Sequence, residues 1–496
     1  MKIENNYIEL VKKTALFLLY LVFAIYTLTY TKADPDLWGY MAFGRLFWES
    51  GKFPYKDVFA FLPTYDQWVY HEWLTGVLFF PLYQNFGAAA LQLLKYCMGL
   101  GTMGFIFMTA LRRGADFYAA ISVLFAISGI LDFGYSPVRA QIFTYFFFAL
   151  SLYLLETARI TKQWKALWWL IPLHILWCNL HGGFLVGLGL IGFYIIGEAV
   201  SRKSFVPYVV VLVLSSLATL INPYGIEYWS FFIRSLPMPR PELVEWFSVY
   251  AAYKYGIIGN FAFIYIMFTI IFLLLLLLWR KPRELTPYIG LGLTIFLGLK
   301  QQRHICFFLL LAGAYMPVWL SAFLEAMKSE AIIQGTLKRI GWKTASLIGI
   351  FFSLIMIVKI ISQNPLSLTL PSQPNQDKKF SAYYPLGAIN YIKENALSGN
   401  ILTVFSWGEY LMWTLYPACR VSLDGRYEQV YPESISKEYF DFIFCRQNWR
   451  NFLNKYSPDM ILIEKESKLY GALRNEPGWN QAYHDSGAAL FLRQLH

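Results

Sequence analysis

The amino-acid sequence predicts a polytopic α-helical membrane protein with about eleven transmembrane helices, followed by a C-terminal extracytoplasmic α/β domain. Composition is the first observation behind this prediction, because 57% of the 496 residues are hydrophobic and only 15% are charged. Soluble domains carry about 25% charged residues, so a single water-soluble globule is excluded. The 42 Phe, 35 Tyr and 17 Trp residues also exclude an intrinsically disordered chain.

The second observation is the alternation of apolar runs with basic loops. Runs of roughly 20 residues, long enough to cross a bilayer as a helix, recur along the first three quarters of the chain. Lysines and arginines outnumber acidic residues by 42 to 31, and they cluster in alternate loops. Assigning every basic cluster to the cytoplasm gives one consistent path through the membrane, because positive loops are retained on that side.

One stretch of this path needs a separate interpretation. Between His71 and Arg112 the chain makes one net crossing, yet it holds two apolar pieces that are separated near residues 85–87. The first piece, 73–84, is short for a span. We therefore expect a half-inserted or interfacial helix there.

The sequence divides into three segments. Residues 1–362 form the expected transmembrane domain, with a first extracytoplasmic loop at 31–71. A segment rich in Pro, Ser, Gln and Asn follows at 363–380 and is typical of a linker. Residues 381–496 have the mixed composition of a soluble α/β domain. The basic N-terminus precedes a longer apolar run, which indicates a retained anchor rather than a cleaved signal peptide.

Alternating strands and helices are expected in the C-terminal domain. The strands are expected at 400–405, 420–423 and 460–464, and the helices at 408–415, 433–444 and 448–455. Outside the cytoplasm Cys419 and Cys445 could form a disulfide, or they could be two unrelated thiols. The five cysteines include no closely spaced pair and no cluster with histidine, which argues against a zinc or iron–sulfur site.

Polar and ionisable residues gather on the non-cytoplasmic side of the expected topology. Such groups are costly at membrane depth, so their convergence indicates a site. The first loop contributes Asp34, Asp36, Arg45, Asp57, Asp66, His71 and Glu72. The opposing helix ends contribute Asp132, Arg139, Gln141, Asn179, His181, Asn222, Arg303 and His304.

This set of residues fits group transfer at a membrane surface. A carboxylate can take a proton from a hydroxyl acceptor, and arginines can hold a phosphate leaving group. Each candidate also has a structural interpretation. Asp36 is equally explained as the N-cap of a helix at 37–49, Asp57 as a turn residue, and Glu72 as a helix cap. Asn179 and His181 precede a double glycine, where the backbone must turn between two spans.

Several motifs give the chain a family resemblance. They lie at 34–40, 44–45, 51–57, 68–74, 139–143, 177–184, 222–225, 405–411 and 424–428. With these motifs the chain resembles the GT-C superfamily of integral-membrane glycosyltransferases, particularly bacterial enzymes of the dolichyl-phosphate-mannose and aminoarabinose-transferase types. The acidic motif directly after the first span carries most of the likeness.

The resemblance implies an active site at the extracytoplasmic face of a bacterial inner membrane. It also implies a polyprenyl-phosphate-linked sugar donor, inversion at the sugar carbon, and an Asp of the first loop as catalytic base. Asp36 matches best, since Tyr40 and Arg45 follow at about the family's spacing. Leu37 departs from the Asp-Glu pair of many relatives. Asp34, which precedes a proline as in oligosaccharyltransferases, is the alternative base.

Further roles follow from the same resemblance. The departing phosphate would be held by Arg303, His304 and Arg139. Substrate or acceptor would be bound by Arg45, His71, Glu72, Asn179 and His181. Asp424 and Arg426 are second-tier candidates, with a buried ion pair that stabilises the C-terminal domain as the slightly favoured alternative.

The expected partners are the lipid-linked sugar, a protein, lipid or glycan acceptor, and membrane lipids, with no nucleic acid. The sequence assigns no cofactor with certainty and leaves the need for a divalent cation open. Two other functions compete with glycosyl transfer, namely a polytopic lipid or glycan transporter and a non-catalytic envelope assembly protein. Transporters usually place polar groups near the bilayer midplane and have repeated halves. This sequence shows neither feature.

Overall fold

The structure is a computed structural model. It describes residues 2–135, 137–257, 265–271, 273–274, 284–327, 342–374, 383–446 and 449–494. By internal contacts the chain separates into two compact units. The first, here called the helical unit, comprises Met1–Thr31, Gln92–Ile221 and Arg240–Ser367. The second, here called the mixed unit, comprises Lys32–Leu91, Asn222–Pro239 and Leu368–His496.

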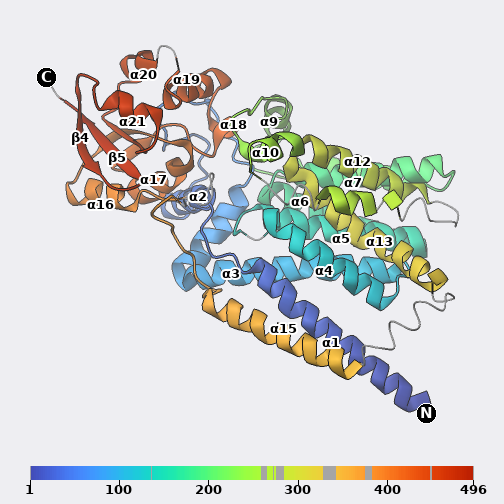
Figure 1. Cartoon of the computed structure of the whole chain (residues 1–496). Coiled ribbons are helices and arrows are strands. Elements are labelled where there is room, and N and C mark those ends of the chain that lie inside the picture. The colour runs from blue at the N-terminus through green and yellow to red at the C-terminus, as the bar shows by residue number, and fades with distance from the viewer. Residues whose placement is uncertain are drawn as a thin grey trace. The chain divides into compact units, whose positions relative to one another are not determined.

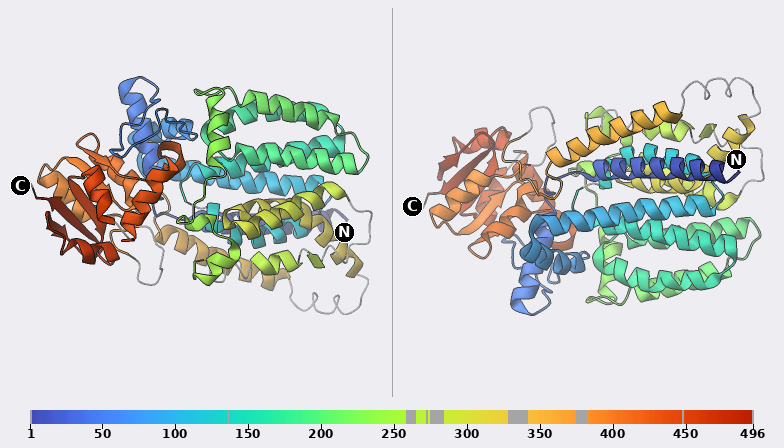
Figure 2. Two further views of the ribbon diagram at one scale, coloured as in Figure 1. Left: turned by 90° about the horizontal axis from the view of Figure 1, so that it is seen from above. Right: turned by 90° about the horizontal axis from the view of Figure 1, so that it is seen from below.

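The helical unit consists of apolar helices that run alongside one another (Figures 1 and 2). Its longer helices are α1 (Lys2–Leu28), α4 (Phe117–Tyr135), α5 (Gln141–Thr161), α6 (Leu170–Leu180), α7 (Phe184–Val200), α8 (Val206–Ala218), α12 (Leu285–Lys300), α13 (Ile305–Met327) and α15 (Trp342–Ser362). Its shorter helices are η1 (Trp164–Trp169), η2 (Val244–Trp246), α10 (Val249–Lys254) and η3 (Gln302–His304).

Helix α13 is the centre of this packing, because it lies between α4 and α12. Gly313 allows the close approach, since a Cβ atom there would lie 2.5 Å from the Cδ1 atom of Ile127 in α4. Helix α1 packs against α4 and against α15. Small residues at such crossings are typical of helices that associate within a membrane.

Three helical stretches of the described residues are long and apolar enough to cross a membrane: Trp73–Arg112, Gln141–Thr161 and Gln302–Ala326. Shorter apolar helical stretches are Phe117–Gly129, Phe184–Val200, Val206–Ala218, Leu285–Lys300 and Ser346–Ser362. These findings support an integral membrane protein. The count of about eleven spans stays a prediction.

Helix α3 (Trp73–Arg112) contains the break that the sequence indicated. Gly87 has a φ of 68° and a ψ of −162°, which interrupts the helix and divides it into two pieces. Glycine tolerates this backbone conformation because it has no Cβ atom. The break near residues 85–87 is therefore confirmed, whereas an interfacial position for 73–84 stays a prediction.

The mixed unit is built on a five-stranded sheet with the order β2-β1-β3-β5-β4. Its strands are β1 (Gly399–Thr403), β2 (Cys419–Val421), β3 (Met460–Glu464), β4 (Trp479–His484) and β5 (Ala488–Arg493). Strand β1 pairs in parallel with β2 and β3, while β5 pairs antiparallel with β3 and β4. The α/β prediction is confirmed for this part of the chain, and the β4–β5 hairpin was not anticipated.

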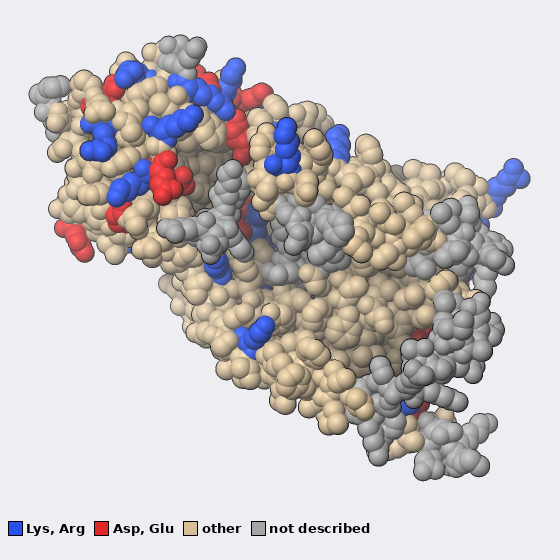
Figure 3. All heavy atoms as spheres, in the orientation of Figure 1, with Lys and Arg blue, Asp and Glu red and all other residues tan. Residues whose placement is uncertain are grey.

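Helices surround this sheet and complete the mixed unit (Figure 1). They are α2 (Leu37–Ser50), α9 (Glu227–Ser235), α16 (Leu386–Glu394), η4 (Phe405–Trp407), α17 (Gly408–Leu415), α18 (Tyr427–Val430), α19 (Glu433–Ile443), α20 (Trp449–Tyr456) and α21 (Lys468–Leu473). In the face shown in Figure 3, charged side chains gather over the C-terminal part of the chain, and the surface of the helices is mostly uncharged.

The first loop is an integral part of the mixed unit. Helix α2 packs against α17. The loop also extends the sheet at β2, where Val421 donates its N–H to Phe59 (2.8 Å) and accepts from Phe61 (3.0 Å). Near the start of the loop, Ala33 donates to the carbonyl of Thr369 (2.9 Å). The expected segment 381–496 therefore shares one compact unit with the loop, and part of the expected linker, 375–380, lies outside the described residues.

The structure decides between the two alternatives for Cys419 and Cys445. Cys419 lies buried in β2, and Cys445 follows α19 with a φ of 51°; both are free thiols. The alternative of two unrelated thiols is therefore correct. The Sγ atom of Cys419 lies 3.8 Å from the carbonyl oxygen of Leu397, so this thiol points toward the backbone of its own domain.

Candidate active site

Asp36 stands at the entrance of helix α2. Its N–H donates to Asp34 Oδ1 (3.1 Å), so Asp34 shapes the turn that leads into the helix. Asp36 occupies the N-cap position, but its side chain makes no capping hydrogen bond. The capping explanation therefore does not account for this carboxylate.

The carboxyl group of Glu409 lies against the same turn. Glu409 Oε2 accepts from the N–H of Gly39 (3.1 Å). A Cβ atom added to Gly425 would lie 2.7 Å from Glu409 Oε1 and 3.2 Å from Asp36 Oδ1. Two carboxyl groups from distant parts of the sequence thus converge on one glycine. At Gly39 a Cβ atom would lie 2.6 Å from Glu409 Cδ, so both glycines make room for this side chain.

Glu409 was not among the residues predicted for the site. It is only 5% exposed. Burial first, and then the charges of Asp36 and Asp424, raise the pKa of Glu409 well above its usual value, because both effects disfavour a second negative charge. Burial and the neighbouring acids therefore favour the protonated form of Glu409.

A buried ion pair lies beside these carboxyl groups. Arg426 binds Asp424 in bidentate fashion, with Nε to Oδ1 at 2.9 Å and Nη2 to Oδ2 at 2.7 Å. Its remaining nitrogen, Nη1, donates to Asp57 of the first loop. Arg426 and Asp424 are 1% and 0% exposed. The alternative of a buried Asp–Arg pair is thus what the structure contains.

The side chain of Asp57 joins two elements. Besides its bond to Arg426, Asp57 Oδ2 accepts from the N–H of Ala60 (2.7 Å), which confirms the expected turn. The guanidinium of Arg426 also lies over Trp68 and Phe59, at 5.0 and 5.4 Å from the ring centroids. The first loop and the C-terminal domain therefore share one charge network.

His71 and Glu72 lie at the start of α3. Tyr40 donates to Glu72 Oε1 (3.4 Å), and His71 Nε2 lies 3.9 Å from the same oxygen. The imidazole of His71 stacks on Phe231, with 5.7 Å between centroids. We use the name acidic cluster for Asp36, Asp57, Glu72, Glu409 and Asp424 together with Arg426.

Arg45, on α2, is placed differently. Its guanidinium lies 4.5 Å from the centroid of the Trp413 ring. Loss of surrounding water lowers the pKa of Arg45 from its usual value. Within the described parts of the chain, no three His, Cys, Asp or Glu side chains are placed to hold a metal ion.

In the helical unit, the structure brings Arg139 and Arg303 together around one carboxylate. Each approaches Glu245 through Nη1 at 3.5 Å, Arg139 at Oε2 and Arg303 at Oε1. Two guanidinium groups also lie over the ring of Trp246. That of Arg240 is 4.2 Å from the ring centroid, and that of Arg303 is 4.5 Å from it. Partial loss of water favours neutral Glu245, but Arg303 and Arg139 lower its pKa below the usual value. Glu245 was missed by the sequence analysis.

The other predicted residues of the helical unit are placed near backbone groups. His304 tilts against Phe307, with 6.3 Å between the rings. Asn179 Nδ2 donates to the carbonyl groups of Ile175 (2.7 Å) and Ile221 (2.9 Å), which ties the end of α6 to the segment after α8.

His181 organises the turn between α6 and α7. Its Nδ1 atom accepts from the N–H of Gly183 (2.9 Å) and lies 2.7 Å from the hydroxyl of Thr144. The structural interpretation of this turn is therefore well supported, because both contacts hold the backbone at the double glycine. The side chain of Asp132 lies outside the described residues.

A second buried charge cluster lies elsewhere in the helical unit. Glu156 Oε2 accepts from Arg113 (2.7 Å) and from Arg159 (2.9 Å). Both arginines also bind Glu284 Oε2, at 2.9 and 3.0 Å. Tyr194 donates to Glu156 Oε1 at 2.7 Å. We call these residues the Glu156 cluster.

Comparison with solved structures supports the fold. The oligosaccharyltransferase of Archaeoglobus fulgidus, solved with a tethered acceptor peptide, is similar over 98% of this chain and 74% of its own, with a TM-score of 0.56 and 13% identity. The archaeal oligosaccharyltransferase AglB from Archaeoglobus fulgidus, solved with an inhibitory peptide and a dolichol-phosphate, gives a TM-score of 0.57 at 12% identity, with coverage of 98% and 75%. ArnT from Cupriavidus metallidurans, bound to undecaprenyl phosphate, gives 0.52 at 14% identity, with coverage of 96% and 97%.

No protein-family model and no curated protein sequence matches the chain. The structural neighbours are GT-C membrane glycosyltransferases, so the resemblance inferred from the motifs is confirmed at the level of the fold. At this level of identity the similarity establishes the architecture alone. The chain has the fold of GT-C membrane glycosyltransferases over nearly its whole length.

Proposed function

We propose that this protein is an inverting membrane glycosyltransferase. It moves a sugar from a polyprenyl-phosphate-linked donor to an acceptor at the extracytoplasmic face, with Asp36 as the general base. The single observation that carries the proposal is the convergence of the Asp36 and Glu409 carboxyl groups on Gly425, with the pKa of Glu409 raised by burial and by its acidic neighbours. The fold shared with ArnT and AglB, two proteins solved with polyprenyl phosphates, supports the donor class.

The protonation of the pair gives Asp36 its role. Two adjacent carboxyl groups do not both ionise readily, and the more deeply buried one retains the proton. Glu409 is the more deeply buried of the two, so we assign the role of base to Asp36. A charged carboxylate accepts the proton of an acceptor hydroxyl while its oxygen attacks the anomeric carbon. The bond from that carbon to the phosphate oxygen breaks, and the phosphate leaves with the electron pair.

The departing phosphate is assigned to Arg139 and Arg303, with His304 next to Arg303 in the sequence. Two arginines that already share one carboxylate can exchange it for a phosphate, since their planar groups bind both anions. The side chain of Glu245 is 41% exposed, so it is accessible to exchange.

Under this proposal the membrane orientation follows the positive-inside rule. The protein lies in a bacterial inner membrane, and the C-terminal domain is extracytoplasmic. Arg45, His71 and Glu72 line the acceptor side. Asn179 and His181 were also predicted to bind substrate or acceptor. Their contacts favour a structural role, because both residues hold the backbone at or near the turn between α6 and α7.

The experiment is release of polyprenyl phosphate from labelled undecaprenyl-phosphate sugars by the purified protein in lipid, with envelope extract as acceptor. We expect Asp36→Asn to lower turnover by about 10²- to 10⁴-fold, because the amide cannot accept the proton. Asp34→Asn is the matched control, since Asp34 shapes the turn, and its effect should be much smaller.

Three results would contradict the proposal in different ways. Loss of turnover only in Asp34→Asn would transfer the role of base to Asp34. Full turnover in both variants would exclude a first-loop base. An envelope function that survives Asp36→Asn, with no donor turnover by the parent protein, would favour a non-catalytic assembly protein.

A further inference from the structure

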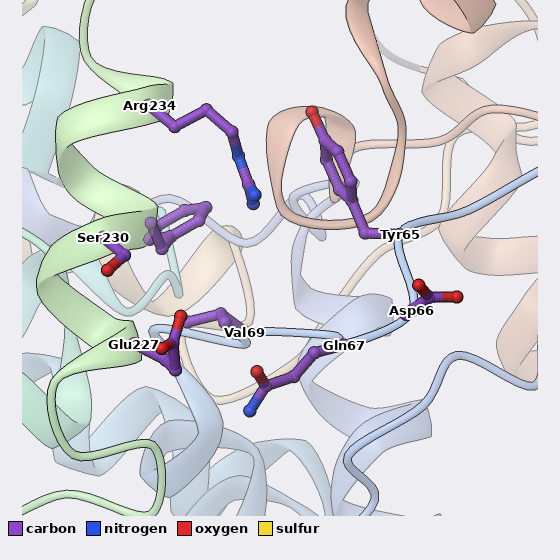
Figure 4. Close-up of a pocket in the computed structure, with 8 residues that line it drawn as sticks. Tyr65, Asp66, Gln67, Val69, Glu227, Ser230 and Arg234 are labelled. Atoms are coloured by element: carbon purple, nitrogen blue, oxygen red, sulfur yellow. The ribbon is translucent and has the colours of Figure 1, made fainter.

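A polar cavity lies in the mixed unit, beside the acidic cluster. Its volume is about 230 Å³, and it opens between helix α9 and the extended segment that leads to Tyr70 (Figure 4). Its polar lining consists of Tyr65, Asp66, Gln67, Glu227, Ser230 and Arg234. Val69 and Phe231 provide the apolar lining.

The periodicity of α9 explains this lining. Glu227, Ser230, Phe231 and Arg234 are spaced at i, i+3, i+4 and i+7, so they share one face of the helix. In Figure 4 the side chain of Arg234 extends from α9 toward Tyr65. The guanidinium of Arg234 lies 4.0 Å from the centroid of the Tyr65 ring.

The lining selects a class of ligand. It offers carboxylate and amide acceptors together with hydroxyl, amide and guanidinium donors, which suits a ligand whose hydroxyl groups both donate and accept. Phe231 provides an apolar face for the C–H side of a ring. Two carboxylates oppose one guanidinium, so the lining does not favour a phosphate. The volume is below the range of about 300–1,000 Å³ typical of drug-sized ligands, which fits a single small ring.

The cavity is one layer of side chains away from the acidic cluster. Phe231 stacks on His71, and His71 contacts Glu72. Val69 is followed directly by Tyr70, which is buried and whose N–H donates to Tyr224 (2.9 Å). The main-chain N–H of Tyr65 donates to Val430 (2.9 Å), just beyond Arg426. A ligand in the cavity is therefore separated from Glu72 of the acidic cluster by the side chains of Phe231 and His71.

We propose that this cavity is an acceptor subsite that binds a neutral sugar ring, so that the acceptor is a carbohydrate or carries one. The inference extends the proposed function and rests on it, because only that function makes the bound sugar an acceptor. The opposite side of α9 bears on the source of the sugar. Ile226, Ile233 and Leu236 are 64%, 73% and 56% exposed at spacings of seven and three, as expected of a helix that lies on a lipid surface.

The test is direct binding without any donor. The protein in phosphatidylethanolamine–phosphatidylglycerol nanodiscs is mixed with methyl α-glucoside, methyl β-galactoside and methyl N-acetyl-β-glucosaminide, and saturation-transfer NMR is recorded. We expect a signal for at least one glycoside. Ser230→Trp should abolish it by filling the cavity, because Ser230 is exposed and tolerates a larger side chain.

Glu227→Gln should weaken the same binding about tenfold, because a charged hydrogen-bond acceptor is lost. Glu394→Gln, an exposed acid at the end of α16, is the matched control and should bind as the parent does. The thermal midpoints of all variants report whether they fold. No signal with any glycoside, or a signal unchanged in both cavity variants, would overturn the inference.

Two further arms separate the possible outcomes. Galactosyl diacylglycerol in the nanodisc identifies a lipid-linked sugar if it displaces the glycoside, and a free or protein-linked sugar if it does not. Asp36→Asn should still bind glycosides, because Asp36 does not line the cavity. Glycoside binding together with turnover that is insensitive to Asp36→Asn would keep this subsite and reject the proposed base.

Discussion

The acidic cluster and the Glu156 cluster are both buried networks of acids and arginines, but their charge balance differs. Glu156 and Glu284 are opposed by Arg113 and Arg159 at hydrogen-bonding distances. In the acidic cluster, Arg426 is already paired with Asp424 and Asp57.

The excess acid in the acidic cluster has a chemical consequence. Glu409 lies beside Asp36 and Asp424, while the guanidinium of Arg426 is bound to Asp424 and Asp57, and burial together with the neighbouring acids raises the pKa of Glu409. In the helical unit, Glu156, Glu284 and the nearby Glu198 each lie within 4.0 Å of an arginine, and breaking such buried pairs is costly. A site that raises the pKa of one acid beside another favours retention of a proton, which is the property that acid–base chemistry needs.

The largest effect on stability is expected from removing the charge of Glu156 in the Glu156 cluster. Glu156→Gln keeps the shape of the side chain and leaves Arg113 and Arg159 with less compensating charge. We expect the free energy of unfolding to fall by about 3–5 kcal/mol. The measurement is thermal or denaturant unfolding in detergent, with Glu394→Gln as the control. Equal stability of the two variants would show that the Glu156 cluster does not stabilise the fold.

A smaller effect of opposite character is expected in the acidic cluster. Glu409→Gln imitates the neutral acid, so stability near pH 5 should barely change. The raised pKa means that folded Glu409 keeps a proton that the unfolded chain releases above about pH 4.3. Parent stability therefore falls, relative to the variant, by at most about 1.4 kcal/mol per pH unit as pH rises toward the folded pKa.

The measurement for Glu409→Gln is the difference in unfolding midpoint between parent and variant from pH 5 to pH 8. The variant should gain on the parent as pH rises, because Gln does not titrate. A difference that stays constant over this range would mean that Glu409 is already ionised in the folded protein.

The smallest effect is expected where an acid is matched by arginines but remains partly exposed. Glu245→Gln removes the carboxylate that Arg139 and Arg303 share. Binding of undecaprenyl phosphate should tighten by up to about fivefold, the scale of a partly exposed ion pair. Titration of the lipid in nanodiscs measures this, with Glu242→Gln as the nearby control. Weaker binding would show that Glu245 helps to hold the phosphate group.

Local patterns predicted much of the mixed unit. The expected helix at 408–415 and the expected strand at 460–464 match α17 and β3 residue for residue. The β4–β5 hairpin was missed because β4 is only half-buried and mixes polar with apolar residues, while β5 begins with two alanines, Ala488 and Ala489, directly after Gly487. Neither strand shows the period-two alternation that identifies strands from sequence.

Long-range contacts explain what the sequence could not predict in the candidate site. The motif at 405–411 was recognised from the sequence. The place of Glu409 in the site, however, is evident only from its hydrogen bond with Gly39, which lies 370 positions away. Glu245 was overlooked because only Asn222 was taken as a candidate from the segment 222–255. A signal did exist, since Arg139 and Arg303 on the side that disfavours basic residues require a counter-charge.

The distance in sequence between Gly39 and Glu409 also determines when the site can exist. A ribosome adds about 5–20 residues per second, so on the order of half a minute separates synthesis of the first loop from synthesis of α17. During that interval Asp36 has no Glu409 beside it, however many helices have already entered the membrane. Under the proposed function, a chain that stalls before α17 is inserted into the membrane but lacks the second carboxyl group of the site.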